Sequence, residues 1–182
     1  MKLSLFLAPV LALAVQARIL QVDNGGSGCP QGSKVTLTSD YSTSFTVSVT
    51  TSVFRATSAD TYKFCQITAL LEGQANTQYA VTAGRYSGSV DLGSGASATH
   101  GAQYYFTGEQ ETGSTAISFN GPTRQSYSSR QILGTPVWSP CGADAGLNIK
   151  SQLIVDGSGA GSITGSVGGK IAYSVQLTSR RC

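Results

Sequence analysis

Alternation of apolar and hydroxyl-bearing residues is the dominant pattern of this chain, and it is clearest in residues 45–53, 147–155 and 171–177. Successive side chains of an extended strand point to opposite faces, so a period of two predicts strands with one buried face. We expect Ser174, Gln176 and Thr178 to face solvent. Eight apolar residues should point into a core between two sheets: Val47, Val49, Leu153, Val155, Ile171, Tyr173, Val175 and Leu177. The same alternation includes Phe45, Val53, Leu147 and Ile149.

Shorter apolar-rich runs predict further strands in residues 34–38, 64–71, 78–92, 102–107, 115–119 and 162–167. Gly84 falls where the alternation changes face, which indicates a β-bulge. Gly168-Gly169 separates two alternating runs and predicts a tight hairpin. No window beyond the N-terminal segment has helical periodicity. The pattern predicts an all-β fold, an antiparallel β-sandwich of jelly-roll-like or Greek-key type.

The N-terminal segment predicts a secretory signal peptide in residues 1–17. Lys2 supplies a positive start, residues 5–15 are apolar, and Val15-Gln16-Ala17 has the small residues that a signal peptidase recognises. The apolar run is too short to span a membrane. We therefore expect a secreted, extracellular protein that begins at Arg18, and a single domain over residues 18–182. The polar C-terminus predicts no membrane anchor.

Secretion implies that the cysteines, Cys29, Cys65, Cys141 and Cys182, are oxidised. Four cysteines allow three pairings. We favour Cys29–Cys65 and Cys141–Cys182, because each closes a loop of about forty residues and would contribute roughly 4 kcal/mol in the chain-entropy model.

The amino-acid composition narrows the classes of possible binding partner. Charged residues make up only 12% of the chain and are scattered along it, without a basic stripe. Nucleic acid and anionic membranes are therefore poor candidates. Because Lys2 leaves with the signal peptide, the formal charge falls from +3 to +2. The one histidine and four paired cysteines leave only carboxylates as ligands, so we expect no metal and no cofactor.

Candidate catalytic residues are few. His100 lies in a stretch rich in Gly, Ser and Ala, which predicts a surface histidine in or near a turn. Glu109 and Glu111 have the spacing of a carboxylate pair, but they lie in a predicted hairpin connection, where both would be solvated. Asp91 and Glu72 are further acids without an evident partner. We expect no catalytic residue.

Aromatic residues are the one feature of the sequence that suggests a binding surface. Tyr104-Tyr105-Phe106 places Tyr104 and Phe106 on one sheet face and leaves Tyr105 on the other. Other tyrosines could extend a platform that stacks on sugars or on a protein, or could simply line a half-buried sheet. They are Tyr41, Tyr62, Tyr79, Tyr86 and Tyr127.

Several motifs resemble a known family. They are residues 26–33 (GSGCPQGS), Cys65-Gln66, residues 138–142 (WSPCG), Leu147-Asn148-Ile149 and the terminal Arg180-Arg181-Cys182. Together they resemble the secreted fungal family termed domain of unknown function 4360, over nearly the whole mature chain. The resemblance implies a small secreted protein with four cysteines, and it brings no catalytic residues with it.

Three functional hypotheses remain. The first is a non-enzymatic secreted protein that acts outside the cell, as an effector-like protein or as a binder of a glycan or of a host or cell-surface protein. The second is a glycan-active hydrolase with paired carboxylates, and the third is a structural protein of the cell wall. Exposed aromatics on one face would favour glycan binding, whereas two facing carboxylates in a cleft would favour the hydrolase.

Overall fold

The computed structural model describes residues 17–40 and 44–182, so residues 1–16 of the predicted signal peptide and Tyr41 lie outside the described residues. Among the described residues, every regular secondary-structure element is a β-strand. The strands are β1 Ile19–Gly25, β2 Val35–Asp40, β3 Ser44–Thr50, β4 Arg55–Thr57, β5 Tyr62–Leu71, β6 Thr77–Leu92, β7 Ala96–Phe106, β8 Thr112–Asn120, β9 Thr123–Trp138, β10 Ala145–Gly157, β11 Gly161–Thr164 and β12 Lys170–Arg181.

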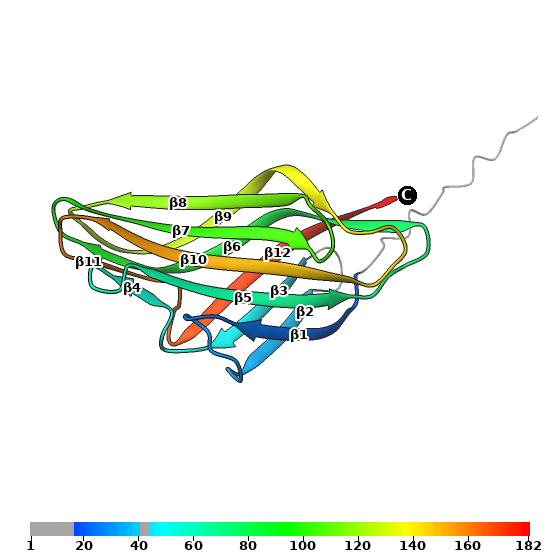
Figure 1. Cartoon of the computed structure of the whole chain (residues 1–182), viewed down its shortest axis with the longest axis horizontal. Helices are drawn as coiled ribbons and strands as arrows, with labels where there is room; N and C mark the ends of the chain where they lie inside the picture. Colours follow the sequence, from blue (N-terminus) through cyan, green and yellow to red (C-terminus); the bar gives the residue numbers. More distant parts are fainter. Residues whose placement is uncertain (1–16, 41–43) are drawn as a thin grey trace, which may run out of the picture.

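The strands form two antiparallel sheets (Figure 1). The five-stranded sheet has the order β1-β5-β10-β7-β8, and the seven-stranded sheet has the order β2-β3-β12-β6-β11-β4, with β9 paired to β6. Strand β6 pairs with β12 and then β11 along one edge, while β9 covers its other edge. The predicted antiparallel β-sandwich is confirmed.

The core lies between the sheets and contains all eight apolar residues predicted for it. Val175 is 1% exposed and Leu177 is 6% exposed, whereas Thr178 on the opposite face is exposed and Ser174 and Gln176 are half-buried. Val53 is 43% exposed, so its inclusion in the alternating strand of Phe45, Val47 and Val49 is wrong. Strand β3 ends at Thr50, and the alternation no longer holds at Val53.

Gly84 is needed for close packing between the sheets and not for a bulge. The register of β6 shifts between Val81 and Ala83, which places the bulge at Thr82. A Cβ atom on Gly84 would lie 1.7 Å from the hydroxyl oxygen of Tyr104 on the facing sheet. The predicted hairpin at Gly168-Gly169 is confirmed, because both glycines have positive φ, 57° and 74°.

Both predicted disulfides are confirmed. Cys29–Cys65 joins the loop after β1 to β5, and Cys141–Cys182 joins the β9–β10 connection to the C-terminus. The first bridge therefore ties the β1–β2 connection to the five-stranded sheet, and the second ties the C-terminus to the β9–β10 connection.

Candidate functional site

The outer face of the five-stranded sheet is the candidate site. In β5, Cys65, Ile67 and Ala69 face the core, so the residues between them point outward. The same alternation holds in β10 and β7. We call nine of the outward residues of these three strands the aromatic–amide face: Tyr62, Phe64, Gln66, Thr68, Gln103, Tyr105, Asn148, Lys150 and Gln152.

The strand register arranges this face in rows across the sheet. Directly paired residues of an antiparallel ladder point to the same side. One row runs Thr68, Asn148, Tyr105 from β5 through β10 to β7. The next row runs Gln66, Lys150, Gln103, and the third places Phe64 beside Gln152. Residues that are far apart in the sequence thus form one surface.

Asn148 fixes the geometry of the face and is itself only 5% exposed. Its Oδ1 atom accepts hydrogen bonds from Thr68 Oγ1 at 2.7 Å and Gln66 Nε2 at 3.3 Å. Its Nδ2 atom donates to Thr107 Oγ1 at 2.9 Å. Because both ends of the amide are bonded, Asn148 holds its neighbours in place and has little capacity left for a ligand.

Aromatic rings occupy one end of the face. The rings of Tyr62 and Phe64 are stacked, with centroids 6.0 Å apart and an interplanar angle of 29°. Lys150 Nζ lies 5.3 Å from the Phe64 centroid, within cation–π range. The Tyr62 hydroxyl donates to Gln152 Oε1 at 3.3 Å, which leaves the amide nitrogen of Gln152 free to donate.

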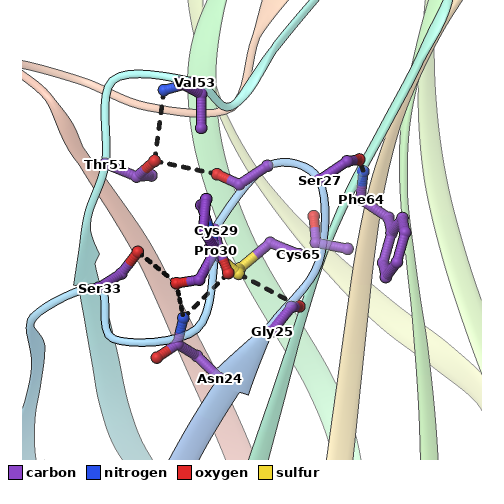
Figure 2. Close-up of a disulfide and its surroundings, with 12 residues drawn as sticks. Asn24, Gly25, Ser27, Cys29, Pro30, Ser33, Thr51, Val53, Phe64 and Cys65 are labelled. Atoms are coloured by element: carbon purple, nitrogen blue, oxygen red, sulfur yellow. Dashed lines mark hydrogen bonds between the residues drawn. A yellow bond between two sulfur atoms is a disulfide. The ribbon is translucent and has the colours of Figure 1, made fainter.

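A shallow depression of about 320 Å³ adjoins the rings, between β1 and β5. Its lining comes from β1 and β5, and the loop that Cys29–Cys65 anchors begins where β1 ends; Figure 2 shows this loop beside Phe64. Asn24 Nδ2 donates to the carbonyl oxygen of Cys29 at 3.0 Å, and the Phe64 backbone nitrogen donates to Ser27 Oγ at 3.2 Å. The lining residues are Asp23, Asn24, Gly25, Phe64, Gln66 and Thr68.

The predicted tyrosine platform is only partly present. Tyr62 is 42% exposed and Tyr105 is half-buried on the outer face, while Tyr104 and Phe106 are buried as predicted. Tyr79 and Tyr86 are 3% and 1% exposed, so their assignment to a surface platform is wrong. Their rings fill the core because β6 turns these positions inward.

Tyr127 also points inward and does not extend the platform. It is half-buried, and its hydroxyl donates to the backbone oxygen of Thr164 at 2.9 Å. Tyr41 lies outside the described residues, so its place on the platform stays a prediction.

His100 is buried in the middle of β7, and the prediction of a surface histidine is wrong. It is 0% exposed, with Nδ1 2.7 Å from the Tyr127 hydroxyl and Nε2 2.8 Å from Ser151 Oγ. Because Tyr127 donates its own proton to Thr164, the Nδ1–H group donates to Tyr127 and Nε2 accepts from Ser151. Burial lowers the pKa of His100 to about 3, so the ring is neutral at physiological pH.

The candidate carboxylates do not form a pair in the depression. Glu109 and Glu111 are exposed in the β7–β8 turn, as predicted. Asp91 lies 3.4 Å from Arg124, and Glu72 lies 3.6 Å from Arg18. Asp23 is the one carboxylate among the lining residues, whereas a glycosidase needs two. The hydrolase hypothesis gains no support from this geometry.

In residues 17–40 and 44–182, no cluster of three or more His, Cys, Asp or Glu side chains could hold a metal ion. Over the same residues, no helix is long and apolar enough to cross a membrane.

Seven members of the aromatic–amide face were not predicted from the sequence: Phe64, Gln66, Thr68, Gln103, Asn148, Lys150 and Gln152. A signal was available in the polar half of the alternation that predicted the core. Asn148, Lys150 and Gln152 interleave with buried residues of β10. That these residues share one surface with residues of β5 and β7 could not be predicted without the order of the strands in the sheet.

Comparison with known proteins gives a family. The model of the family "Domain of unknown function (DUF4360)" matches residues 15–182, so the chain belongs to this family, as its motifs suggested. An uncharacterized secreted protein of Arthroderma benhamiae is 32% identical over 144 residues, which are 76% of this chain and 59% of that protein. The chain thus spans 59% of the length of this relative. The present chain is a secreted, extracellular protein, and its two disulfides fit that location.

Solved structures with a similar arrangement are distant. TmCBM61 in complex with beta-1,4-galactotriose is 11% identical, covers 88% of both chains and has a TM-score of 0.26. The Family 11 carbohydrate-binding module from Clostridium thermocellum is 10% identical, with a TM-score of 0.24 over 90% of this chain and 96% of its own. The arabinose-bound MgGH51 arabinofuranosidase has a TM-score of 0.32 over 87% of this chain and 25% of its own, at 11% identity. Similarity at this level supports no conclusion about ligand or activity.

Proposed function

We propose that this member of the family, domain of unknown function 4360, is a non-enzymatic protein that binds a neutral glycan outside the cell on its aromatic–amide face. One observation carries the proposal: partly exposed aromatic rings share a face with side-chain amides. Tyr62, Phe64 and Tyr105 supply the rings, and Gln103 and Gln152 supply the amides.

The chemistry of a sugar matches this combination. A sugar ring has an apolar C–H face that packs on an aromatic ring, and a rim of hydroxyl groups that both donate and accept hydrogen bonds. Amide side chains also donate and accept, so they complement hydroxyl groups of either orientation. The Tyr62–Phe64 stack offers the apolar contact, and Gln152 stands beside it in the same row as Phe64.

Preorganisation supports the same function. Asn148 and its hydrogen bonds hold Thr68 and Gln66, and the Cys29–Cys65 loop holds the wall beside Phe64. A face that is already ordered loses less conformational entropy on binding. From Tyr62 to Thr68 the outward positions extend about 20 Å at roughly 3.4 Å per residue, which suits a short oligosaccharide lying along β5.

The charge of the face favours a neutral ligand. Among the nine side chains of the aromatic–amide face, Lys150 is the one with a charge, and it lies over the Phe64 ring. A strongly anionic or cationic ligand would find little complementary charge there.

A glycan array with the purified mature protein tests the proposal. We expect binding to neutral oligosaccharides, and an affinity at least tenfold weaker for Tyr105→Ala and for Gln152→Ala. Gln176→Ala is the matched control, because Gln176 is also a half-buried sheet amide but lies on the other sheet. Absence of binding to every neutral glycan, or equal losses for Gln152→Ala and Gln176→Ala, would contradict the proposal.

A further inference from the structure

The outer face of the seven-stranded sheet has a different character, because it collects arginines from four strands. Directly paired residues share a face, so the register places all of them on one side. Arg85 pairs with Arg130 on β9 and with Ser174 on β12. Arg55 on β4 pairs with Thr164 on β11, which in turn pairs with Ser89 on β6, so Arg55 lies on the same side as Arg85. The set, which we call the arginine face, is Arg55, Arg85, Arg124, Arg130 and Arg180. The folded surface therefore has a basic stripe. The expectation that there is none, which rested on the scattering of charged residues along the sequence, was wrong.

Arg85 and Arg130 lie directly opposite each other in the β6–β9 ladder. The Cβ atoms of such a pair are about 5 Å apart, and like charges in this arrangement repel. Arg130 donates to the amide oxygen of Gln176, which is neutral. Within the described part of the chain neither guanidinium has an ion pair. An anionic group seated between them would remove the repulsion and form charge-assisted hydrogen bonds with both.

Ion pairing neutralises one member of the face, Arg124, which lies 3.4 Å from Asp91. Arg55 donates to Ser162 Oγ at 3.0 Å, and Arg180 donates to Gln78 Oε1 at 3.1 Å. Both of these partners are neutral. Among the described residues, four of the five arginines of the face therefore have no acidic partner, and the face keeps an excess of positive charge.

Short hydroxyl side chains cover the sheet between the arginines. Ser87 pairs with Ser128, and Ser89 pairs with Ser126, in the two rows between Arg85 and Asp91. A hydroxyl group both donates and accepts, so these rows can hydrogen-bond to the hydroxyl groups of a polymer whose charges meet the longer guanidiniums. Trp138 lies under the Arg180 guanidinium, 3.8 Å from its ring centroid, and so offers no free ring on which a nucleic-acid base could stack.

We propose that the arginine face binds an acidic polysaccharide, a sugar polymer that bears carboxylate groups. The Arg85–Arg130 pair would hold one carboxylate, and the serine rows would contact the sugar hydroxyl groups along β6 and β9. This surface lies on the sheet opposite the aromatic–amide face, and the proposal does not depend on the neutral-glycan site. The protein would thereby contact two carbohydrates of different charge at once.

Polygalacturonate is a suitable probe, with its fully methyl-esterified and therefore uncharged form as the matched ligand control. We expect the purified mature protein to bind polygalacturonate, to bind the ester at least tenfold more weakly, and to lose affinity as salt rises. The double variant Arg85→Gln/Arg130→Gln should bind polygalacturonate at least tenfold more weakly. It should fold normally, because both side chains are exposed and their mutual repulsion is removed.

The matched control is Arg18→Gln/Lys34→Gln, which removes the same net charge from exposed positions outside the arginine face. Its affinity for polygalacturonate should stay within about twofold of the parent protein. Equal losses for the two double variants would mean that net charge alone is responsible, and would overturn the proposal. Binding of polyuridylate or of anionic phospholipid vesicles as tight as that of polygalacturonate, with the same dependence on Arg85 and Arg130, would overturn the choice of a polysaccharide.

Discussion

His100 of the five-stranded sheet and Tyr127 of the seven-stranded sheet are hydrogen-bonded across the core, with Nδ1 2.7 Å from the phenol oxygen. The backbone oxygen of Thr164 accepts a hydrogen bond from the Tyr127 hydroxyl group, and Ser151 Oγ lies 2.8 Å from the other ring nitrogen of His100. The two sheets are thus joined by a polar chain inside an apolar core. A protonated imidazole would have to reverse the bond at Nε2, where the new N–H group would donate to Ser151 Oγ, and it would be a buried charge.

This network predicts that stability falls in mild acid. The folded pKa of His100 is about 3, below the ordinary value of 6.5 for the unfolded chain. Between these values the unfolded chain binds a proton that the folded chain does not, so the free energy of unfolding falls as pH falls. We expect a loss of about 2 kcal/mol between pH 7.5 and pH 5 in urea unfolding, at about 1.4 kcal/mol per pKa unit. The variant His100→Gln should lack this slope, and an equal slope in both proteins would assign it to other groups.

Contact between the sheets at Gly84 gives a second prediction. The added Cβ of Gly84→Ala would overlap the Tyr104 hydroxyl, so we expect a loss of about 2–3 kcal/mol in the free energy of unfolding. Gly134→Ala is the control, because its Cβ would meet no atom within 4 Å, and it should change stability by less than about 0.5 kcal/mol. Combining Gly84→Ala with Tyr104→Phe should recover part of the loss. Similar values for Gly84→Ala and Gly134→Ala would contradict the proposed close contact.

The two faces of β12 give a third prediction. Val175 is 1% exposed, so Val175→Ala should cost about 1–3 kcal/mol from lost burial and the cavity left behind. Its neighbour Gln176 points outward, and Gln176→Ala should cost well under 1 kcal/mol. Denaturant unfolding of both variants measures the difference. Equal costs would mean that β12 is buried on both faces.

The C-terminal disulfide gives a fourth prediction. Cys141 and Cys182 close a loop with a sequence separation of 41. Cys182→Ser should therefore lower the free energy of unfolding by roughly 2–5 kcal/mol, because the unfolded chain gains the freedom of the opened loop. Cys141→Ser/Cys182→Ser is the control for a free thiol. A double variant as stable as the parent protein would show that the bridge contributes little.

The sequence predicted the fold well wherever one face of a strand is apolar. Burial alternates regularly along β3 and along β12 from Lys170 to Thr178, and over most of β10, and the apolar residues of the inward positions lie in the core. Strand β9 was missed because it is an edge strand with polar residues on both faces over most of its length. Its inward apolar residues, Tyr127, Leu133 and Val137, are too widely spaced to form a period of two.

The site was harder to predict because it depends on pairing between distant segments. Gln66, Lys150 and Gln103 form one row only because β10 lies between β5 and β7. Burial of His100 has the same origin, since Tyr127 and Ser151 are 27 and 51 residues away in sequence. A polar residue surrounded by Gly, Ser and Ala resembles a turn until its partners are known.

Backbone-amide NMR of the protein, titrated with an array-selected neutral oligosaccharide, would locate the neutral-glycan site. We expect the shifted resonances to cluster on the aromatic–amide face at Phe64, Gln103, Tyr105 and Gln152, and those of Arg85 and Arg130 on the opposite sheet to stay unchanged. Shifts confined to the arginine face or to the loops, with the aromatic–amide face unchanged, would contradict this placement of the site.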